Sequence, residues 1–225
     1  MAGCLCALLV ATGCGGGGDS GAHGNDDPSD SYLPLALGNS WEYVMKLHPD
    51  MEPIVVPQTE DFQQFIWRET VTAVESRPEW EVDYFLIHAY REATDDYRDY
   101  EEYQLRRSTE EEISARMLFV DDDEEFYYHD VTQLTLPPVE GDTWPDAALG
   151  ATFTTAAVGE QITVPAGTFR CVRVEMSYDG PEEADPADAF VVKTWYAPGV
   201  GIVRDETWEG DELTSMIELV EYEVQ

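Results

Sequence analysis

Carboxylates are the most numerous chemically active side chains of this sequence, and the chemistry they favour is cation binding. Five of them form one run: Asp121, Asp122, Asp123, Glu124 and Glu125. Because Ca²⁺ takes six to eight oxygen ligands, this run or the acidic segment 179–188 could bind it. Counted from Asp121, however, the sixth position is Phe126 and the twelfth is Thr132, where an EF-hand has glycine and glutamate. A weak calcium site and a solvated acidic loop are both open interpretations.

Motifs of catalytic and zinc sites do not occur in the sequence. Neither HExxH nor Cys-x-x-Cys is found, and the histidines lie far apart, at His23, His48, His88 and His129. Ser40 lacks the second glycine of a Gly-x-Ser-x-Gly nucleophile elbow. Acid pairs are too abundant to identify a glycosidase, whose two carboxylates must be placed in space. The sequence thus predicts a non-enzymatic protein with no catalytic residue, no metal-binding motif and no cofactor.

The net charge of the chain is strongly negative. Its 47 acidic and 12 basic residues give a formal net charge of −35. Nucleic acids are recognised by clustered Lys and Arg, so this charge excludes nucleic acid as a partner. The same charge keeps the protein soluble and predicts diffuse association with divalent cations.

The cysteines predict no disulfide framework. Cys4, Cys6 and Cys14 lie at the N-terminus, and Cys171 is alone in the rest of the chain, where it cannot form an internal bridge. Cys171 lies in a stretch of alternating apolar and polar residues. This setting favours a buried small hydrophobe over a reactive thiol.

The N-terminus places small residues between a short apolar run and a cysteine. Residues 5–10 are too few to span a bilayer, which needs about 20 apolar residues. The following Ala11-Thr12-Gly13-Cys14 resembles a bacterial lipobox, a motif in which the signal is removed and the cysteine becomes the lipidated first residue. The resemblance implies a signal peptide at 1–13 and lipidation of Cys14. An ordinary cleaved signal and an apolar N-terminus that arose by chance are the alternatives.

Two features depart from the lipobox pattern. Ala11 stands where leucine is commonest, and no basic residue precedes the apolar run, so we expect the natural start to lie upstream. Residues 14–31 are predicted to be the lipidated cysteine and a flexible tether rich in Gly and Asp. Gly15 replaces the aspartate that would favour inner-membrane retention. The resemblance therefore implies a lipid anchor in the outer membrane, facing the periplasm or the cell surface.

From residue 32 onward the pattern is typical of β-strands. Aromatic and β-branched residues alternate with polar ones, and Gly and Pro separate the runs. A break is expected at Gly159 and a turn at 165–167. The strand-like segments are 40–47, 62–75, 80–90, 113–120, 125–136, 151–178, 189–208 and 212–224. Because helices do not alternate with these runs, we predict one antiparallel all-β domain over 32–225.

Residues 94–107 fit two kinds of element. Tyr97, Tyr100 and Tyr103 recur every three residues, and Glu102 and Arg106 are four apart, as on a helix. Tyrosine nevertheless favours strands, and the segment is poor in the aliphatic residues that a helix would bury. We predict a strand and keep the helix as the alternative.

Four motifs in the predicted domain resemble landmarks of a widespread set of bacterial secreted and lipoprotein β-domains. In order, they are YLPLALGNSWEY, LPPVEGDTW, VPAGTFRCVRVE and WYAPGVGIVR. The resemblance implies one strongly curved sheet or half-open barrel, similar to the folds of periplasmic lipoprotein carriers, and it implies no biochemical activity. Within it, Gly38-Asn39-Ser40-Trp41 and Gly141-Asp142-Thr143-Trp144 share a pattern, from either a duplicated half or independent turns that precede a tryptophan.

The aromatic residues are the remaining candidates for binding. Six Trp, twelve Tyr and eight Phe could line the concave face of the sheet for an apolar ligand, or simply fill the core. We therefore expect a non-enzymatic envelope lipoprotein with a binding or scaffolding role, whose partner is an apolar small molecule held in the concave sheet or an envelope protein. A calcium-dependent surface or adhesion module is the alternative, and a hydrolase ranks third.

Overall fold

The structure is a computed structural model, in which the described part of the chain folds into β-strands. The described residues are 31–47, 63–77, 80, 82–91, 100–120, 126–178 and 189–225. Twelve strands occur in this part: β1 Ser40–Leu47, β2 Gln63–Glu75, β3 Tyr84–Arg91, β4 Tyr100–Ser108, β5 Glu112–Val120, β6 Phe126–Thr135, β7 Thr143–Asp146, β8 Ala151–Val164, β9 Gly167–Tyr178, β10 Phe190–Ala197, β11 Gly201–Glu209 and β12 Glu212–Glu223.

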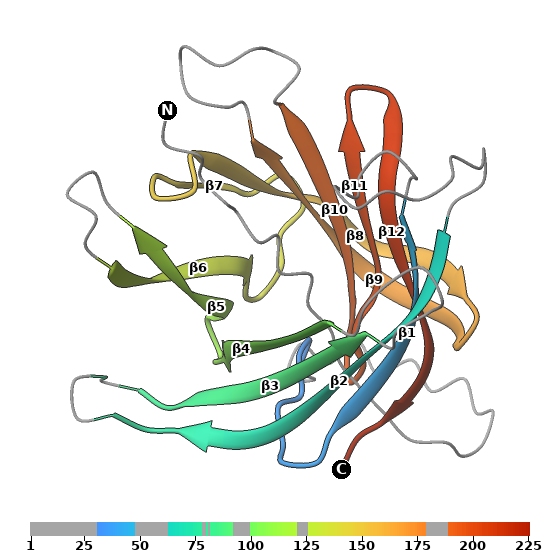
Figure 1. Ribbon diagram of the computed structural model, residues 1–225. Helices are drawn as coiled ribbons and strands as arrows, with labels where there is room; N and C mark the ends of the chain where they lie inside the picture. The colour runs from blue at the N-terminus through green and yellow to red at the C-terminus, as the bar shows by residue number, and fades with distance from the viewer. Residues whose placement is uncertain are drawn as a thin grey trace.

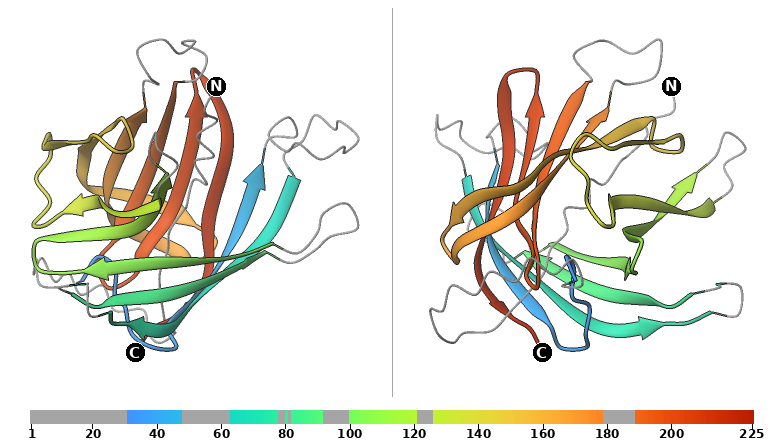
Figure 2. Two further views of the ribbon diagram at one scale, coloured as in Figure 1. Left: turned by 60° about the vertical axis from the view of Figure 1, so that its left-hand side comes forward. Right: turned by 180° about the vertical axis from the view of Figure 1, so that it is seen from behind.

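The strands form one antiparallel sheet of simple connectivity. Its order is β6-β5-β4-β3-β2-β1-β12-β11-β10-β9-β8-β7, so strands that follow each other in sequence pair, except β6 and β7, which are the two edges, and β1 pairs with β12. The chain therefore makes two meanders of six strands, β1–β6 and β7–β12. Figures 1 and 2 show that the sheet curves until its edges approach each other, which gives a nearly closed barrel. The predicted all-β fold is confirmed.

The two edge strands, β6 and β7, approach each other through side chains. The indole Nε1 of Trp144 donates to the carbonyl oxygen of Thr132 at 2.8 Å. Beside it, His129 Nε2 lies 2.9 and 3.1 Å from the carboxylate oxygens of Asp146. We call this junction the β6–β7 seam.

The buried residues form two apolar clusters. The first joins Trp41 and Trp67, on β1 and β2, to Trp195 and to Val164 at the end of β8. The second lies between β5–β6 and β8–β11 and includes Leu33, which is fully buried. Trp41, Trp67 and Trp195 are thus core residues, as one of the two interpretations of the aromatic residues predicted.

The segment before β1 closes one end of the barrel. Leu33 enters the second cluster, Ser31 accepts a hydrogen bond from the backbone of Gly199 at 2.9 Å, and the Asn39 side chain bonds the carbonyl of Pro34. Because the β10–β11 turn and the C-terminal Gln225 lie at this end, the plugged end is opposite the end at which β9 stops and β10 begins.

The two Gly-x-Ser/Thr-Trp motifs have the same backbone geometry. Gly38 has a φ of +87° and Gly141 a φ of +92°. At the first motif, Gly38 N donates to Val71 O and Val71 N donates to Asn39 O. At the second, Gly141 N donates to Thr155 O and Thr155 N donates to Asp142 O. Each motif therefore begins the first strand of one six-stranded meander, and its glycine supplies the left-handed backbone that the turn requires.

The strand boundaries correct the expected break at Gly159 and decide between strand and helix for Tyr100–Ser108. Gly159 does not end a strand: β8 continues through it with a register shift, because its φ of +80° accommodates the extra residue of a β-bulge. In the ambiguous segment, Tyr100–Ser108 is strand β4, so the helical alternative is wrong there. Cross-strand partners on β3 and β5 decide this outcome.

Candidate functional site

Strand register determines which side chains of the first meander face the barrel interior. Trp67 pairs with Tyr43, and Glu69 pairs with Ala89, which in turn pairs with Glu102. Residues two apart on a strand share a face. Gln104 and Arg106 therefore follow Glu102 on the interior face of β4, whereas Tyr103 and Arg107 face outward.

Arg106 is a fully buried cation whose hydrogen-bonding capacity is only partly used. Its side chain is 0% exposed. Its Nε and Nη2 donate to Gln104 Oε1 at 3.0 and 2.5 Å, but Nη1 has no partner in the described part of the molecule. Burial lowers the pKa of Arg106, and the negative charge of Glu69 opposes this effect. A charged donor in the interior thus has a free N–H group.

Asp205 is a second buried charged group, on β11. It is 3% exposed and accepts a hydrogen bond of 2.6 Å from Thr194 Oγ1. Burial raises the pKa of Asp205 to about 7, even though the bond from Thr194 and the charge of Arg106 act to lower it. Near neutral pH this carboxyl is therefore divided between its two protonation states.

These groups form one interior polar cluster, contributed by strands from both meanders. Arg106 on β4 interacts electrostatically with Glu69 on β2, with Tyr196 on β10 and with Asp205 on β11. The hydroxyls of Thr155 and Thr207 and the indole nitrogen of Trp41 are also buried without a hydrogen-bond partner among the described residues. We define the interior polar cluster as Glu69, Gln104, Arg106, Thr194, Tyr196 and Asp205.

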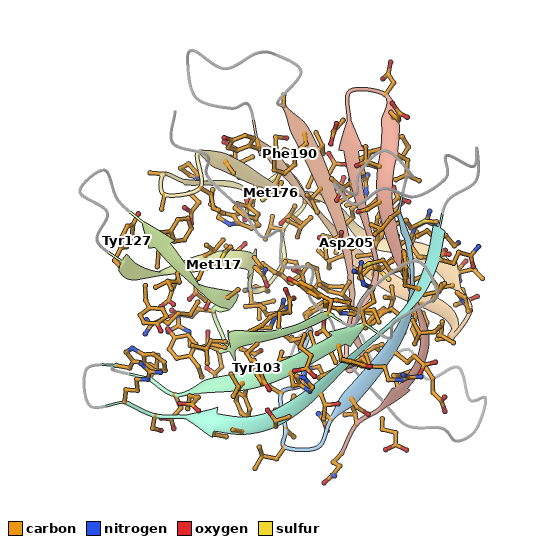
Figure 3. All side chains as sticks on the ribbon, in the orientation of Figure 1. Tyr103, Met117, Tyr127, Met176, Phe190 and Asp205 are labelled. Carbon is orange, nitrogen blue, oxygen red and sulfur yellow. The ribbon has the colours of Figure 1, made fainter. Side chains whose placement is uncertain are left out.

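Apolar side chains line the interior away from the plugged end. On β5 and β6, Phe119 stacks on its partner Tyr127 with ring centroids 5.8 Å apart. On β9 and β10, Tyr178 is the cross-strand partner of Phe190, and their ring centroids lie 4.9 Å apart. We call the set the apolar rim: Met117, Phe119, Tyr127, Met176, Tyr178 and Phe190. Figure 3 shows Met117 and Tyr127 on one side of the barrel and Met176 and Phe190 on another.

The rim differs from the core in exposure. Tyr127 is 40% exposed, and Met117, Phe119, Met176, Tyr178 and Phe190 are half-buried, whereas Trp41 is 2% exposed. Half-buried large apolar side chains on an interior face are those that can gain contacts when an apolar ligand binds.

The outer face of β3–β6 carries an ion-pair network that has a structural explanation. Arg116 donates two hydrogen bonds to Asp130, at 2.7 and 2.8 Å, and Tyr84 donates to the same carboxylate at 2.5 Å. Burial raises the pKa of Asp130, but the bonds from Arg116 and Tyr84 outweigh it, so the pKa is lowered overall. The Arg116 guanidinium also lies 4.8 Å from the ring centroid of Trp80. These contacts tie the β2–β3 connection to the sheet.

Several residues considered from the sequence do not form a site in the described structure. Cys14 and the run 121–125 lie outside the described residues, so lipidation and calcium binding remain predictions. Cys171 is buried and free, and burial raises the pKa of its thiol to about 12, as expected for a core residue. His88 stacks on Tyr103 outside the barrel, apart from His129 at the seam.

The described residues contain neither a cluster of metal-binding side chains nor a helix that could cross a membrane. No group of three or more His, Cys, Asp or Glu side chains in them could hold a metal ion. None of their segments forms a helix with the length and apolarity to cross a membrane.

Sequence reasoning did not identify the interior polar cluster. The alternation of β4 places Glu102, Gln104 and Arg106 on one face, but its opposite face carries the polar Arg107 as well. A strand that is polar on both faces does not indicate which side is buried. The one usable signal is that Arg106 follows Glu102 and Gln104 at alternate positions, so the three share a face of the strand. A buried guanidinium requires such acceptors as partners.

Comparisons with known proteins support the fold. Residues 155–219 match a family model described as DUF3108-like, a region that contains two of the four motifs, VPAGTF and WYAPGVG. A search of curated proteins found no match.

Two solved structures resemble the chain. One is a protein from Bacteroides fragilis described as exported and as having a YmcC-like fold, with a TM-score of 0.53, 16% identity, and coverage of 87% of this chain and 100% of the other. The other, from Parabacteroides distasonis, is described as a lipoprotein, with a TM-score of 0.52, 15% identity, and coverage of 86% and 99%. At these identities the likeness shows the fold.

Proposed function

We propose that this protein is a lipid-anchored, non-enzymatic protein of the bacterial envelope that binds an apolar ligand inside its barrel. The apolar rim is the observation that carries the proposal. Its six residues come from four strands in both meanders and face the interior at the end opposite the plug. An apolar ligand there would remove their half-exposed surface from water, which is favourable by about 25 cal/mol per Å².

The envelope location is supported by the lipobox-like sequence and by the solved structures. Cys14 follows small residues and precedes a Gly-rich tether. The similar proteins of Bacteroides fragilis and Parabacteroides distasonis are described as exported and as a lipoprotein. The anchor is tested by Cys14→Ser in the full chain: incorporation of radiolabelled fatty acid should be lost, and unchanged labelling would overturn the assignment.

Ligand binding is tested on the full chain with Cys14→Ser, using an apolar fluorescent probe such as 1-N-phenylnaphthylamine. We expect saturable binding, and native mass spectrometry should show a co-purified adduct of several hundred daltons. A flat fluorescence titration together with a bare mass would overturn the proposal.

A matched pair of substitutions places the ligand in the barrel. Met117 faces the interior and the adjacent Leu118, 55% exposed, faces outward. Met117→Asp should weaken probe binding by about tenfold or more, because it adds a charge to the apolar surface, and Leu118→Asp should leave it unchanged. Equal effects of the two substitutions would place the ligand elsewhere. Thermal melting of both variants controls for folding.

A further inference from the structure

We infer that the interior polar cluster recognises the head of a neutral acyl ester, with Arg106 Nη1 donating a hydrogen bond to an ester carbonyl oxygen of the ligand. This inference rests on the proposed function and adds the chemical class of the ligand. Its basis is the free N–H group of a fully buried guanidinium that faces the interior of the barrel.

An unused buried hydrogen-bond donor is costly in free energy. A guanidinium has five N–H donors and no acceptor. The described structure supplies Arg106 with a neutral amide oxygen, Gln104 Oε1, and leaves Nη1 without a partner. An unpaired buried group of this kind loses the water that would solvate it and gains nothing in return. An oxygen acceptor on a ligand would remove this deficit.

Three other buried groups on interior-facing residues can also donate hydrogen bonds. Trp41 Nε1 can only donate, and the hydroxyls of Thr155 and Thr207 can donate or accept. All three are buried and without a partner among the described residues. The interior of the barrel is therefore complementary to a head with several acceptor oxygens, such as an ester with adjacent hydroxyls.

The charges around Arg106 favour a neutral head over an anionic one. Three carboxyl groups, Glu69, Glu102 and Asp205, interact electrostatically with the Arg106 guanidinium. A carboxylate or phosphate on the ligand would add another acid to a low-dielectric interior, inside a chain whose formal net charge is −35. A carbonyl oxygen accepts the same hydrogen bond without this repulsion.

The interior polar cluster lies closer to the plugged end of the barrel than the apolar rim does. Thr194 on β10 is the cross-strand partner of Asp205. Along β10, Thr194 lies two residues beyond Val192 and four residues beyond Phe190 of the apolar rim, toward the plugged end. A ligand whose tail contacts the rim would thus extend its head toward Arg106. The combination of an apolar entrance and polar interior donors fits a molecule with one acyl tail and a small neutral head.

The experiment is displacement of the bound probe by three compounds of similar tail length: monoolein, oleate and 1-octadecene. The full chain with Cys14→Ser is used throughout. We expect monoolein to displace the probe at about tenfold lower concentration than either of the others, since octadecene lacks an acceptor and oleate adds a charge.

A matched pair of substitutions on β4 assigns the recognition to Arg106. Arg106→Met should weaken monoolein binding by about tenfold or more and leave octadecene binding unchanged, whereas Arg107→Met, on the outer face, should change neither. If Arg106→Met does not fold, the three compounds on the unsubstituted interior still decide the inference.

The outcomes separate the inference from the proposed function. Probe binding with equal displacement by monoolein and octadecene would overturn the ester head and leave the apolar site standing. Stronger displacement by oleate would overturn the neutral head. Absence of any probe binding would overturn the proposed function and this inference together.

Discussion

The two junctions between the meanders of the barrel are built differently. At the first, β1 and β12 pair along their whole contact, from Ser40 opposite Glu223 to Leu47 opposite Ser215. At the second, β6 and β7 are the two edges of the sheet, and side chains of Trp144 and His129 connect them. One junction is a hydrogen-bonded ladder and the other is a seam.

The sequence of β7 explains part of the difference. β7 has only four residues, and one of them, Pro145, has no N–H group to donate. β12 has twelve residues and β1 has eight. A short strand with proline is typical of a sheet edge. The comparison teaches that the fold depends on the β1–β12 ladder, while the seam is the part of the wall that can open at lower cost.

The largest effect is expected at the ladder. Leu219 on β12 is fully buried opposite Tyr43, so Leu219→Ala should lower the free energy of unfolding by about 2–5 kcal/mol through lost contacts and a cavity. Chemical denaturation measures it. Val139→Ala, 51% exposed and just before β7, is the control and should change stability by less than about 0.5 kcal/mol. Similar losses in the two variants would refute the difference between the junctions.

The next effect is the pH dependence of stability that arises from one carboxyl group near each junction. Burial raises the pKa of Asp205, on β11 beside β12, to about 7. The folded protein holds this proton above the unfolded pKa of about 3.9, so stability falls as pH rises from about 4 to about 7, by up to about 4 kcal/mol. The stability of Asp205→Asn relative to the parent should therefore increase as pH rises from about 4 to about 7 and stay constant above that.

Asp130, on the seam strand β6, is the matched control with the opposite sign. Its pKa is lowered overall by the bonds from Arg116 and Tyr84. Its stabilisation is therefore present above the unfolded pKa of about 3.9 and lost as pH falls below it. Asp130→Asn should destabilise the protein at neutral pH. Parallel pH profiles for the parent and Asp205→Asn would contradict the assignment of a buried, partly protonated Asp205.

The smallest effect is expected at the seam itself. Trp144→Phe removes one hydrogen bond, to Thr132 O, and should cost about 1 kcal/mol. Amide hydrogen exchange should speed up in β6 and β7 and stay unchanged in β1 and β12. Trp208→Phe, which removes a bond to Glu206 on the outer face of β11, controls for loss of an indole N–H. Faster exchange in all four strands would show that the seam is not an independent unit.

The strands could be predicted because their signals are local. Segments 40–47 and 62–75 were expected as strands and are β1 and β2 within one residue. The turn at 165–167 separates β8 from β9 as expected. In each case alternation and turn residues act over a few positions.

The failures occurred where the deciding contact is distant in sequence. Gly159 was predicted to end a strand, but the partner strand β9 continues past it and converts the glycine into a bulge. The burial of Arg106 was not predicted, because the charged groups that interact with it come from β2 and β11 as well as from its own strand. The sequence of one strand does not show which other strands or segments pack against it.

The sequence by itself determined the class of fold and the charge of this protein: antiparallel strands punctuated by Gly and Pro, a very acidic surface, and a lipobox-like cysteine before a tether. Only the tertiary structure decided that Arg106 and Asp205 meet inside a barrel and that one end is plugged by Leu33. The physical reason is that periodicity fixes which residues share a face, whereas burial depends on strands that are far apart in the chain and close in space.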